Sequence, residues 1–291
     1  MAWAALLRVA LLPTILWDFL VGLRLAGTWR FEGDLIALTA LLCFYHGGMA
    51  LNDVRDRELD RQSGRKRPLV DGRIPFPAAT GVALLLIGGG WLLAQGVSPG
   101  LAEAAPWLAA AVVLYDLSAG TLRRSLGPYL LAAARGFSLG WPVLAIGGFA
   151  AAGRPDVLPA LVVYGIYFFS VSRVAQAEET GMRGRIGILY FGTAALVPIV
   201  LAYAPEFHLL FLLPWALFGF WLMRPALQAG PGHWDPEQVQ KLVRHGLSSG
   251  PLLLATCLVA LGEGPTDWLL AAAAPLVMLS VRRMARVLPP E

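Results

Sequence analysis

Four polar side chains in the stretch NDVRDRELD have the types and the spacing of a cation site. Asp53, Asp56 and Asp60 follow one another at intervals of three and four positions, and Asn52 comes directly before them. Residues at these intervals share one face of a helix, so the three carboxylates would gather at one place. Each adjacent like-charge pair on a helix costs roughly a few tenths of a kcal/mol unless a cation intervenes. Carboxylates that meet at one point suit Mg²⁺, which commonly bridges protein carboxylates and phosphate oxygens.

The charges in and after this stretch allow two interpretations. The basic residues Arg65, Lys66 and Arg67 follow shortly after it and could bind the phosphates that such a cation holds. Alternatively, the stretch is a solvated helix end with local ion pairs, because charge runs beside membranes are common. In that case the acidic residues would pair with their basic neighbours, Asp56, Glu58 and Asp60 with Arg55, Arg57 and Arg61.

A second polar stretch, SRVAQAEETGMRGR, spans residues 172–185. On a helix, Ser172, Gln176 and Glu179 would share one face, with Glu178 about one position round from it. Acidic and basic groups mix here as they do in the first stretch. A capped, solvated loop would have a similar composition, so this stretch alone does not specify a site.

The chain that must position these residues has the composition of a helical membrane protein. Of its 291 residues, 57% are hydrophobic and 14% are charged, and the mean hydropathy is +0.63. The net charge is +4, but the basic residues are concentrated in a few loops, which indicates membrane orientation and not nucleic-acid binding. We expect one domain, residues 1–291, embedded in the lipid bilayer.

A helix needs about 20 apolar residues to cross a bilayer, or somewhat fewer where neighbouring helices bury its ends. The apolar runs predict helices near residues 5–26, 34–54, 78–97, 104–121, 127–150, 157–177, 187–204, 207–223, 247–262 and 266–283. The last two runs are short, so they are two crossings, or one crossing with a re-entrant or interfacial piece. The prediction is an all-α polytopic membrane bundle of nine to ten transmembrane helices around a central cavity.

Charge in the connections between these runs predicts the orientation. The basic connections are residues 55–73 and those that carry Arg123 and Arg124, Arg183 and Arg185, and Arg224, Lys241 and Arg244. The connections between them are short and mostly acidic, and they include Glu206 and Glu263. We therefore expect an integral protein of the cytoplasmic membrane with the basic connections on the cytoplasmic side. Arginines after the last run place the C-terminus on that side too, which predicts an even number of crossings.

Three charged residues lie inside the apolar runs. Asp18 is near the middle of the first run, Arg135 is about two turns into the fifth, and Arg173 is near the end of the sixth. Ionisable groups at membrane depth are costly and are therefore candidates for function. The alternatives are snorkelling towards the interface or a buried Asp–Arg pair that holds helices together.

A membrane cavity with Mg²⁺ carboxylates at its polar mouth suits an amphiphile that has a diphosphate head and a hydrocarbon tail. Prenyl diphosphates fit this description. Metal and arginines would draw negative charge onto the leaving diphosphate and so help the allylic carbon become cationic. Aromatic rings such as Tyr45, Tyr115 or Tyr167 could stabilise that cation, although packing in the core is the alternative for each ring.

The same residues resemble the UbiA superfamily of intramembrane prenyltransferases. The first motif of that superfamily, NDxxDxxxD, matches NDVRDRELD, and its following basic stretch with RPL and a glycine matches KRPLVDG. Tyr115, followed by Arg123 and Arg124, is similar to a tyrosine and basic pair of the family, and Arg135-Gly136 is similar to a polar site in its fifth helix. The resemblance covers nearly the whole chain and implies a UbiA-like fold.

The resemblance also implies site residues. It assigns the Mg²⁺-diphosphate motif to Asn52, Asp53, Asp56 and Asp60, and diphosphate contacts to Arg67, Arg123 and Arg124. The second motif departs from the usual DxxxD pattern, because residues 173–185 contain no aspartate. Glu178 and Glu179 are the acids there, and glutamate can still bind Mg²⁺. The lead-in YHGGMALND and this glutamate-bearing loop resemble an EboC-like branch of the superfamily.

The leading hypothesis is a Mg²⁺-dependent prenyltransferase that moves a prenyl group from a prenyl diphosphate to an aromatic or small polar acceptor. Its expected catalytic residues are Asn52, Asp53, Asp56, Asp60 and Glu179, and its expected metal ligands are Asp53, Asp56, Asp60, Glu178 and Glu179. Substrate binding is expected from Lys66, Arg67, Tyr115, Arg123, Arg124, Arg135, Arg173, Gln176 and Asp18. The alternative is a catalytically degenerate relative that binds or carries an isoprenoid lipid. A secondary transporter would require matched broken helices, which the sequence does not show.

Overall fold

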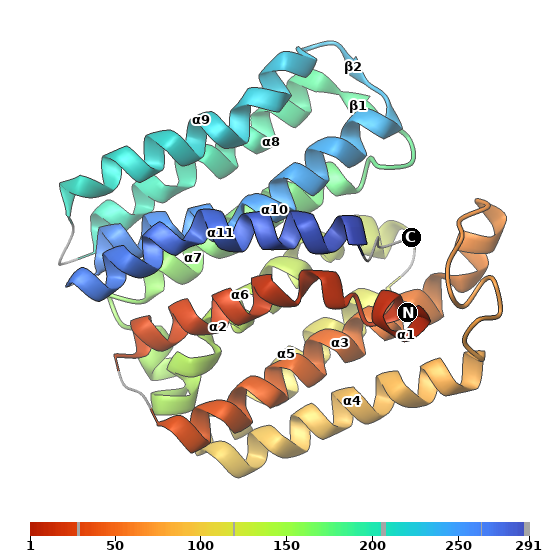
Figure 1. Cartoon of the computed structure of the whole chain (residues 1–291), viewed down its shortest axis with the longest axis horizontal. Helices are drawn as coiled ribbons and strands as arrows, with labels where there is room; N and C mark the ends of the chain where they lie inside the picture. The colour runs from red at the N-terminus through yellow and green to blue at the C-terminus, as the bar shows by residue number, and fades with distance from the viewer. Residues whose placement is uncertain (28–29, 119, 205–207, 263, 288–291) are drawn as a thin grey trace.

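Long helices account for most of the chain in the computed structural model, which describes residues 1–27, 30–118, 120–204, 208–262 and 264–287 (Figure 1). The elements are α1 (Ala2–Leu6), η1 (Val9–Leu11), α2 (Leu12–Ala26), α3 (Phe31–Gln62), α4 (Phe76–Val97), α5 (Pro99–Leu117), α6 (Gly120–Ala152), α7 (Leu158–Ala175), β1 (Met182–Arg183), α8 (Gly184–Leu196), η2 (Val197–Tyr203), η3 (Leu209–Phe211), α9 (Leu212–Ala229), β2 (His233–Trp234), α10 (Pro236–Leu261) and α11 (Pro265–Val287). Strands β1 and β2 pair antiparallel and join two of the connections.

Ten segments within the described ranges are long and apolar enough to cross a membrane. The predicted all-α polytopic bundle is therefore confirmed, and both C-terminal runs qualify as spans. Helix α10 begins at Pro236, earlier than the predicted start near residue 247. The reason is local, since Asp235 and Gln238 form a capping box that starts the helix before its apolar part.

The connections sort to the two ends of the bundle. Figure 1 shows the α3–α4 connection, the β1–β2 pair, the first residues and the end of α11 at one end, on the right of the view. The α2–α3 and α8–α9 connections lie at the opposite end. This arrangement agrees with an even number of crossings. Glu206 and Glu263, which were expected in acidic connections, lie outside the described residues.

Helix α3 carries the first polar stretch as one continuous helix. It was expected to end near residue 54, but it runs to Gln62 and stops at Ser63 and Gly64, where Gly64 adopts a φ of 68°. No proline or glycine interrupts residues 49–62, so the helix continues beyond its apolar part. The acidic face is therefore held on rigid backbone.

The predicted first helix is broken near its start. Helix α1 ends at Leu6, and Arg8 has a φ of 50° and a ψ of 44°, a left-handed conformation that is uncommon for a residue with a side chain. Pro13 then lies in the first turn of α2, where a missing N–H is tolerated. His46 Nδ1 lies 2.7 Å from the carbonyl oxygen of Leu7 and can donate to it, which fixes the break against α3.

Two hydrophobic cores flank the centre of the bundle. One is formed mainly by α7 to α10 and contains Tyr164 and Trp234; the other is formed mainly by α3 to α5 and contains Phe44. Helices α2 and α6 contribute to both cores. Trp17 of α2 and Leu139 of α6 lie in the first core, and Phe19 of α2 and Trp141 of α6 lie in the second. Polar side chains on α2 and α6 can therefore lie between the cores, at the centre of the bundle.

Candidate active site

The three aspartates of α3 turn towards the protein. Asp53 and Asp60 are each only 3% exposed, and Asp56 is half-buried. In contrast, Glu58 is exposed and pairs loosely with Arg61 at 3.9 Å. The local pairing expected for a solvated stretch is found for Glu58 with Arg61 and for Asp56 with Arg55. The three aspartates share one face, as the spacing predicted, and that face turns inward.

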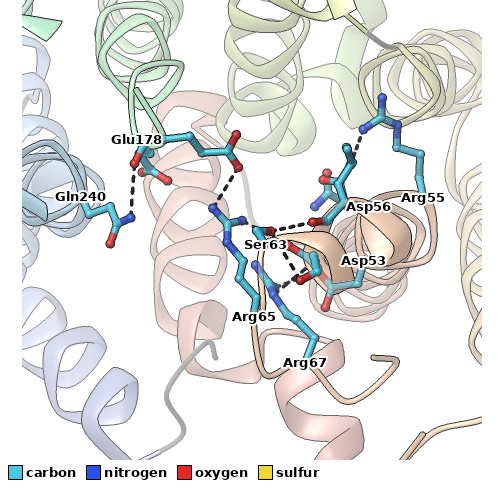
Figure 2. A network of polar contacts seen from close by, with 12 residues as sticks. Asp53, Arg55, Asp56, Ser63, Arg65, Arg67, Glu178 and Gln240 are labelled. Atoms are coloured by element: carbon cyan, nitrogen blue, oxygen red, sulfur yellow. Dashed lines mark hydrogen bonds and ion pairs between the residues drawn. The ribbon is translucent and has the colours of Figure 1, made fainter. Parts of the chain in front are cut away.

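Arginines from two distant segments hold Asp53 and Asp60. Asp53 Oδ1 accepts hydrogen bonds from Arg8 Nη2 at 3.2 Å and from Arg67 Nη1 at 3.1 Å. Asp60 Oδ1 accepts from Arg65 Nη1 at 3.2 Å, and Asp60 Oδ2 lies 3.5 Å from Arg67 Nε. Figure 2 shows Arg65 and Arg67 reaching from the loop after α3 towards this face. Each of these two carboxylates thus faces two guanidinium groups.

Arg123 joins the other two motif residues to α6. Its Nη1 donates to Asp56 Oδ1 at 2.9 Å, and its Nη2 donates to Asn52 Oδ1 at 2.9 Å. The guanidinium also lies over the Tyr115 ring, 5.3 Å from the centroid, and Arg55 is a second partner of Asp56. The structure therefore brings together Asn52, Asp56, Arg123 and Tyr115, as the sequence predicted.

The α3 aspartates are surrounded by guanidinium groups. Around the three aspartates, the described residues supply five guanidinium groups, from Arg8, Arg55, Arg65, Arg67 and Arg123. Guanidinium groups bind phosphate oxygens through paired, charge-assisted hydrogen bonds. The cluster is therefore suited to a polyvalent anion such as a diphosphate.

The donor chemistry of the cluster fits Mg²⁺. Its carboxylate and amide oxygens are hard ligands, and Mg²⁺ usually needs only one or two protein carboxylates beside phosphate oxygens and water. Within the described residues, no three Asp, Glu, His or Cys side chains converge as a metal site. The reason is that Asp53, Asp56 and Asp60 each point at arginines, so an anion that engaged those arginines would leave the carboxylates available.

Arg65 links the second polar stretch to the aspartate–arginine cluster. Helix α7 ends at Ala175, so Glu178 and Glu179 lie in a turn and not on a helical face. Glu179 is exposed and accepts from Arg65 Nη2 at 3.0 Å, which links the two polar loops. Glu178 is partly buried, and its backbone oxygen accepts a hydrogen bond from Gln240 Nε2 at 3.3 Å (Figure 2). Burial raises the pKa of the Glu178 carboxyl, although nearby arginines act to lower it.

Six predicted substrate-binding residues lie outside the arginine–aspartate cluster: Lys66, Arg124, Arg173 and Gln176 at the polar end of the bundle, and Asp18 and Arg135 within it. Lys66 is exposed and makes no hydrogen bond or ion pair with any described residue. Arg124 also has an exposed side chain, while its carbonyl oxygen accepts from Gln176 Nε2 at 2.7 Å and from Arg173 Nη1 at 3.3 Å. Arg173 and Gln176 therefore support the start of α6, from which Arg123 extends.

Asp18 and Arg135 meet at the centre of the bundle, as one of the sequence interpretations expected. Arg135 Nη2 lies 2.9 Å from Asp18 Oδ2, and Asp18 is only 1% exposed. Ser138 and Tyr164 both donate hydrogen bonds to the Asp18 carboxylate. Tyr167, by contrast, donates to the carbonyl oxygen of Gly246 within the hydrophobic core, which is a packing role.

Sequence analysis missed two residues of the cluster. Arg8 was not predicted as a site residue, because its pairing with Asp53 spans 45 positions. Asp116 directly follows the predicted Tyr115; it is 2% exposed, and the charges of Arg123 and Asp56 act on it. No hydrogen bond or ion pair joins its carboxylate to another described residue. Its position at the end of an apolar run, as for Asp18, was an available signal.

Comparisons with known proteins agree with this architecture. Residues 11–232 match the model of the UbiA prenyltransferase family. No curated protein sequence matches the chain. These findings place most of the chain, including the aspartates of α3, in one family.

Two solved structures illustrate the shared fold. The structure from work on digeranylgeranylglyceryl phosphate synthase in membranes has a TM-score of 0.62 and 15% identity, covering 88% of this chain and 96% of that one. A UbiA homolog from Archaeoglobus fulgidus bound to DMAPP and Mg²⁺ has a TM-score of 0.57 and 14% identity, covering 99% of both chains. The same homolog bound to GPP and Mg²⁺ has a TM-score of 0.52 and 12% identity. At such identities the likeness shows a common fold.

Proposed function

The chain belongs to the UbiA prenyltransferase family, and we propose that it transfers a prenyl group from a prenyl diphosphate to an acceptor in a Mg²⁺-dependent reaction. The observation that carries this proposal is the pairing of each α3 aspartate with two guanidinium groups, which provides both hard oxygen ligands and phosphate donors in one cluster. The homolog structures with DMAPP or GPP and Mg²⁺ share this fold and support the choice of substrate.

The arginines are the proposed diphosphate ligands. Arg67 comes from the loop after α3 and contacts Asp53, whereas Arg123 comes from α6 and contacts Asp56. Their guanidinium groups are held by carboxylates, so they stay close to the position that the diphosphate would take. A diphosphate would replace the carboxylates as the hydrogen-bond acceptors of these guanidinium groups.

Asp53 and Asp56, with Asp60 and the nearby Glu178 and Glu179, are the proposed Mg²⁺ ligands. When bound, the metal would stabilise the negative charge that develops on the departing diphosphate. Arg67 and Arg123 stabilise the same charge through hydrogen bonds, which helps the allylic C–O bond to break. The burial of Asp53 and Asp60 limits access of water, which strengthens these electrostatic interactions.

The surrounding helices suit the hydrocarbon part of the substrate. The cluster lies at the end of α3, where the apolar span gives way to the charged loops, so a prenyl tail can extend into the membrane-embedded part of the protein. The protein is an integral membrane protein, and we place the charged end on the cytoplasmic side of the cytoplasmic membrane, because its connections carry most of the arginines and lysines.

Diphosphate release tests this proposal. The purified protein in detergent would be incubated with radiolabelled prenyl diphosphates, Mg²⁺ and a panel of acceptors. Wild type should release diphosphate only with Mg²⁺, and Asp53→Asn should abolish the release. The matched control is Asp71→Asn, since Asp71 lies in the same loop region but is exposed and pairs with Arg73.

The result would also separate the enzyme from an isoprenoid carrier. An inert wild type that binds the prenyl lipid as well as Asp53→Asn does would contradict the proposed transfer. Wild-type release that Asp53→Asn retains would instead contradict the assigned metal site.

A further inference from the structure

A closed polar network surrounds Asp18 in the middle of the bundle. Asp18 Oδ2 accepts a hydrogen bond from Ser138 Oγ at 2.9 Å and lies 2.9 Å from Arg135 Nη2. Asp18 Oδ1 accepts from the Tyr164 hydroxyl, which in turn accepts from Arg135 Nη2 at 2.7 Å. The groups come from α2, α6 and α7, so three helices depend on this network.

The charges within the network compensate each other. One carboxylate, Asp18, faces one guanidinium, Arg135, and the remaining members are neutral hydroxyl groups. Both carboxylate oxygens already accept hydrogen bonds. A ligand that carried a further charge would therefore bring an uncompensated charge into a buried site, which is strongly unfavourable.

Two polar atoms beside this network are buried and have no hydrogen-bond partner among the residues that the structure describes. They are Arg135 Nε, on a guanidinium that lies over the Phe168 ring at 4.4 Å, and the hydroxyl of Tyr45. Buried donors without partners are rare and call for an explanation such as a missing ligand. Both atoms can donate a hydrogen bond, so they would suit an oxygen atom of a bound molecule.

Tyr45 connects this network with the aspartate–arginine cluster. It lies seven positions before Asn52 on α3, so the two side chains share a helix face. Tyr45 is within range of the charges of Arg135, Asp18 and Arg8. Arg8 in turn donates a hydrogen bond to Asp53. The unpartnered Tyr45 hydroxyl therefore belongs to a residue about two helical turns, roughly 10 Å along α3, from Asn52 on the membrane-embedded side of the proposed diphosphate site.

We propose that these atoms bind the acceptor and that the acceptor is an uncharged molecule that bears a hydroxyl group. This inference rests on the proposed prenyl transfer. The acceptor oxygen would form the new bond to the allylic carbon with its lone pair, while the bond from that carbon to the diphosphate breaks with its electron pair. The hydroxyl proton leaves with the released diphosphate. Asp18 acts as a specificity residue, because it neutralises Arg135 and so removes the attraction for a carboxylate.

Matched acceptor pairs test the inference. The purified wild type would receive the prenyl diphosphate and Mg²⁺ with either glycerol or glycerate, and with either 4-hydroxybenzyl alcohol or 4-hydroxybenzoate. The preferred alcohol should stimulate diphosphate release about tenfold or more over its matched carboxylate, because the carboxylate is uncompensated in this site. Donor binding is measured separately with the radiolabelled prenyl diphosphate.

Asp18→Asn provides the second arm. The amide retains the shape of the side chain but leaves Arg135 positively charged, so the preference should shift about tenfold towards the carboxylate member. Asp156→Asn, at an exposed aspartate paired with Arg154, should leave the preference unchanged. If Asp18 had only a structural role, Asp18→Asn would lower the rates of diphosphate release with the alcohol and with the carboxylate by the same factor.

Three results overturn the inference while the proposed function stands. In the first, the wild type uses the carboxylates as well as the alcohols. In the second, the wild type binds the donor but no alcohol stimulates diphosphate release. In the third, Asp18→Asn has the wild-type ratio of diphosphate release with the alcohol to release with the carboxylate. If Asp18→Asn does not fold, the wild-type comparison decides alone. A wild type that does not bind the prenyl diphosphate with Mg²⁺ contradicts the proposed function itself.

Discussion

Arg8 donates a hydrogen bond from Nη2 to Asp53 Oδ1 at 3.2 Å, across 45 positions of sequence. Arg8 adopts a left-handed backbone conformation at the break between α1 and α2, and that conformation is uncommon for residues with a side chain. Such strain persists only where the surrounding structure enforces it, and it is frequent at functional sites. The start of the chain therefore belongs to the aspartate–arginine cluster.

Arg8→Gln should weaken binding of the prenyl diphosphate. A charge-assisted hydrogen bond contributes about 1.5–3 kcal/mol, so KM should rise roughly 10- to 100-fold. The matched control is Arg57→Gln, because Arg57 is exposed, lies over the Phe76 ring and forms no ion pair with a described residue. Steady-state kinetics would measure both variants. Equal KM values for Arg8→Gln and wild type would exclude Arg8 from donor binding.

Asp116→Asn should make the protein more stable and less active. The Asp116 carboxylate is 2% exposed, and it has no hydrogen-bond or ion-pair partner among the described residues. Ionising a buried carboxyl that has no partner is costly, so the amide should stabilise the fold by about 1 kcal/mol or more at any pH where the Asp116 carboxyl is ionised. The variant would also lose the attraction between the Asp116 carboxylate and Arg123, which should lower kcat/KM. Groups that serve an active site often make the fold less stable.

Thermal unfolding in detergent would measure this effect, with Asp71→Asn as an exposed aspartate control. A lower Tm for Asp116→Asn would mean that the carboxylate stabilises the fold. Our interpretation of Asp116 as a group retained for function would then be wrong.

Local patterns explain how much of the architecture the sequence predicted. The long apolar runs specify membrane helices because a span must satisfy its own backbone and its length must match the bilayer. The spacing of Asp53, Asp56 and Asp60 placed them on one face because helix geometry is local. Charge in the connections likewise predicted which connections gather at one end of the bundle.

The partners of these residues depend on tertiary structure and could not be read from spacing. The pairing of Asp53 with Arg8 depends on the break after α1, and the pairing of Asp18 with Arg135 depends on how α2 and α6 pack. The sequence left open whether Glu178 and Glu179 lie on a helical face or in a solvated loop. In the structure α7 ends at Ala175, and the turn after it leads through Gly181, with a φ of 71°, into the β1–β2 pairing.

The three consecutive glycines of α4 should differ in their tolerance of alanine. A Cβ at Gly90 would lie 2.9 Å from the carbonyl oxygen of Ala40 and 3.1 Å from Cys43 Cβ, whereas a Cβ at Gly89 meets nothing within 4 Å. Gly90→Ala should therefore destabilise the α3–α4 contact by about 1–3 kcal/mol. Gly89→Ala should be neutral or stabilising by up to about 1 kcal/mol, because alanine is the better helix former. Thermal unfolding of the two variants would contradict this packing if their Tm values were equal.

The Glu179 side chain should matter for the metal requirement and little for stability. It is 71% exposed and pairs with Arg65, and exposed ion pairs contribute only about 0–1 kcal/mol. Glu179→Gln should therefore unfold at nearly the wild-type Tm. If Glu179 is a Mg²⁺ ligand, the Mg²⁺ concentration for half-maximal diphosphate release should rise about tenfold, since each lost carboxylate ligand weakens a site that has few of them.

Two further variants decide between the neighbouring glutamates. Glu178→Gln replaces the half-buried carboxyl of the same turn, and Glu237→Gln replaces an exposed glutamate that pairs with Lys241 at 2.6 Å. The Mg²⁺ requirement of Glu237→Gln should equal that of wild type. A requirement raised by Glu178→Gln but not by Glu179→Gln would assign the ligand to Glu178, with Glu179 serving only to pair with Arg65. No change in either variant would leave the metal to the aspartates of α3 alone, because the turn after α7 would then contribute no ligand.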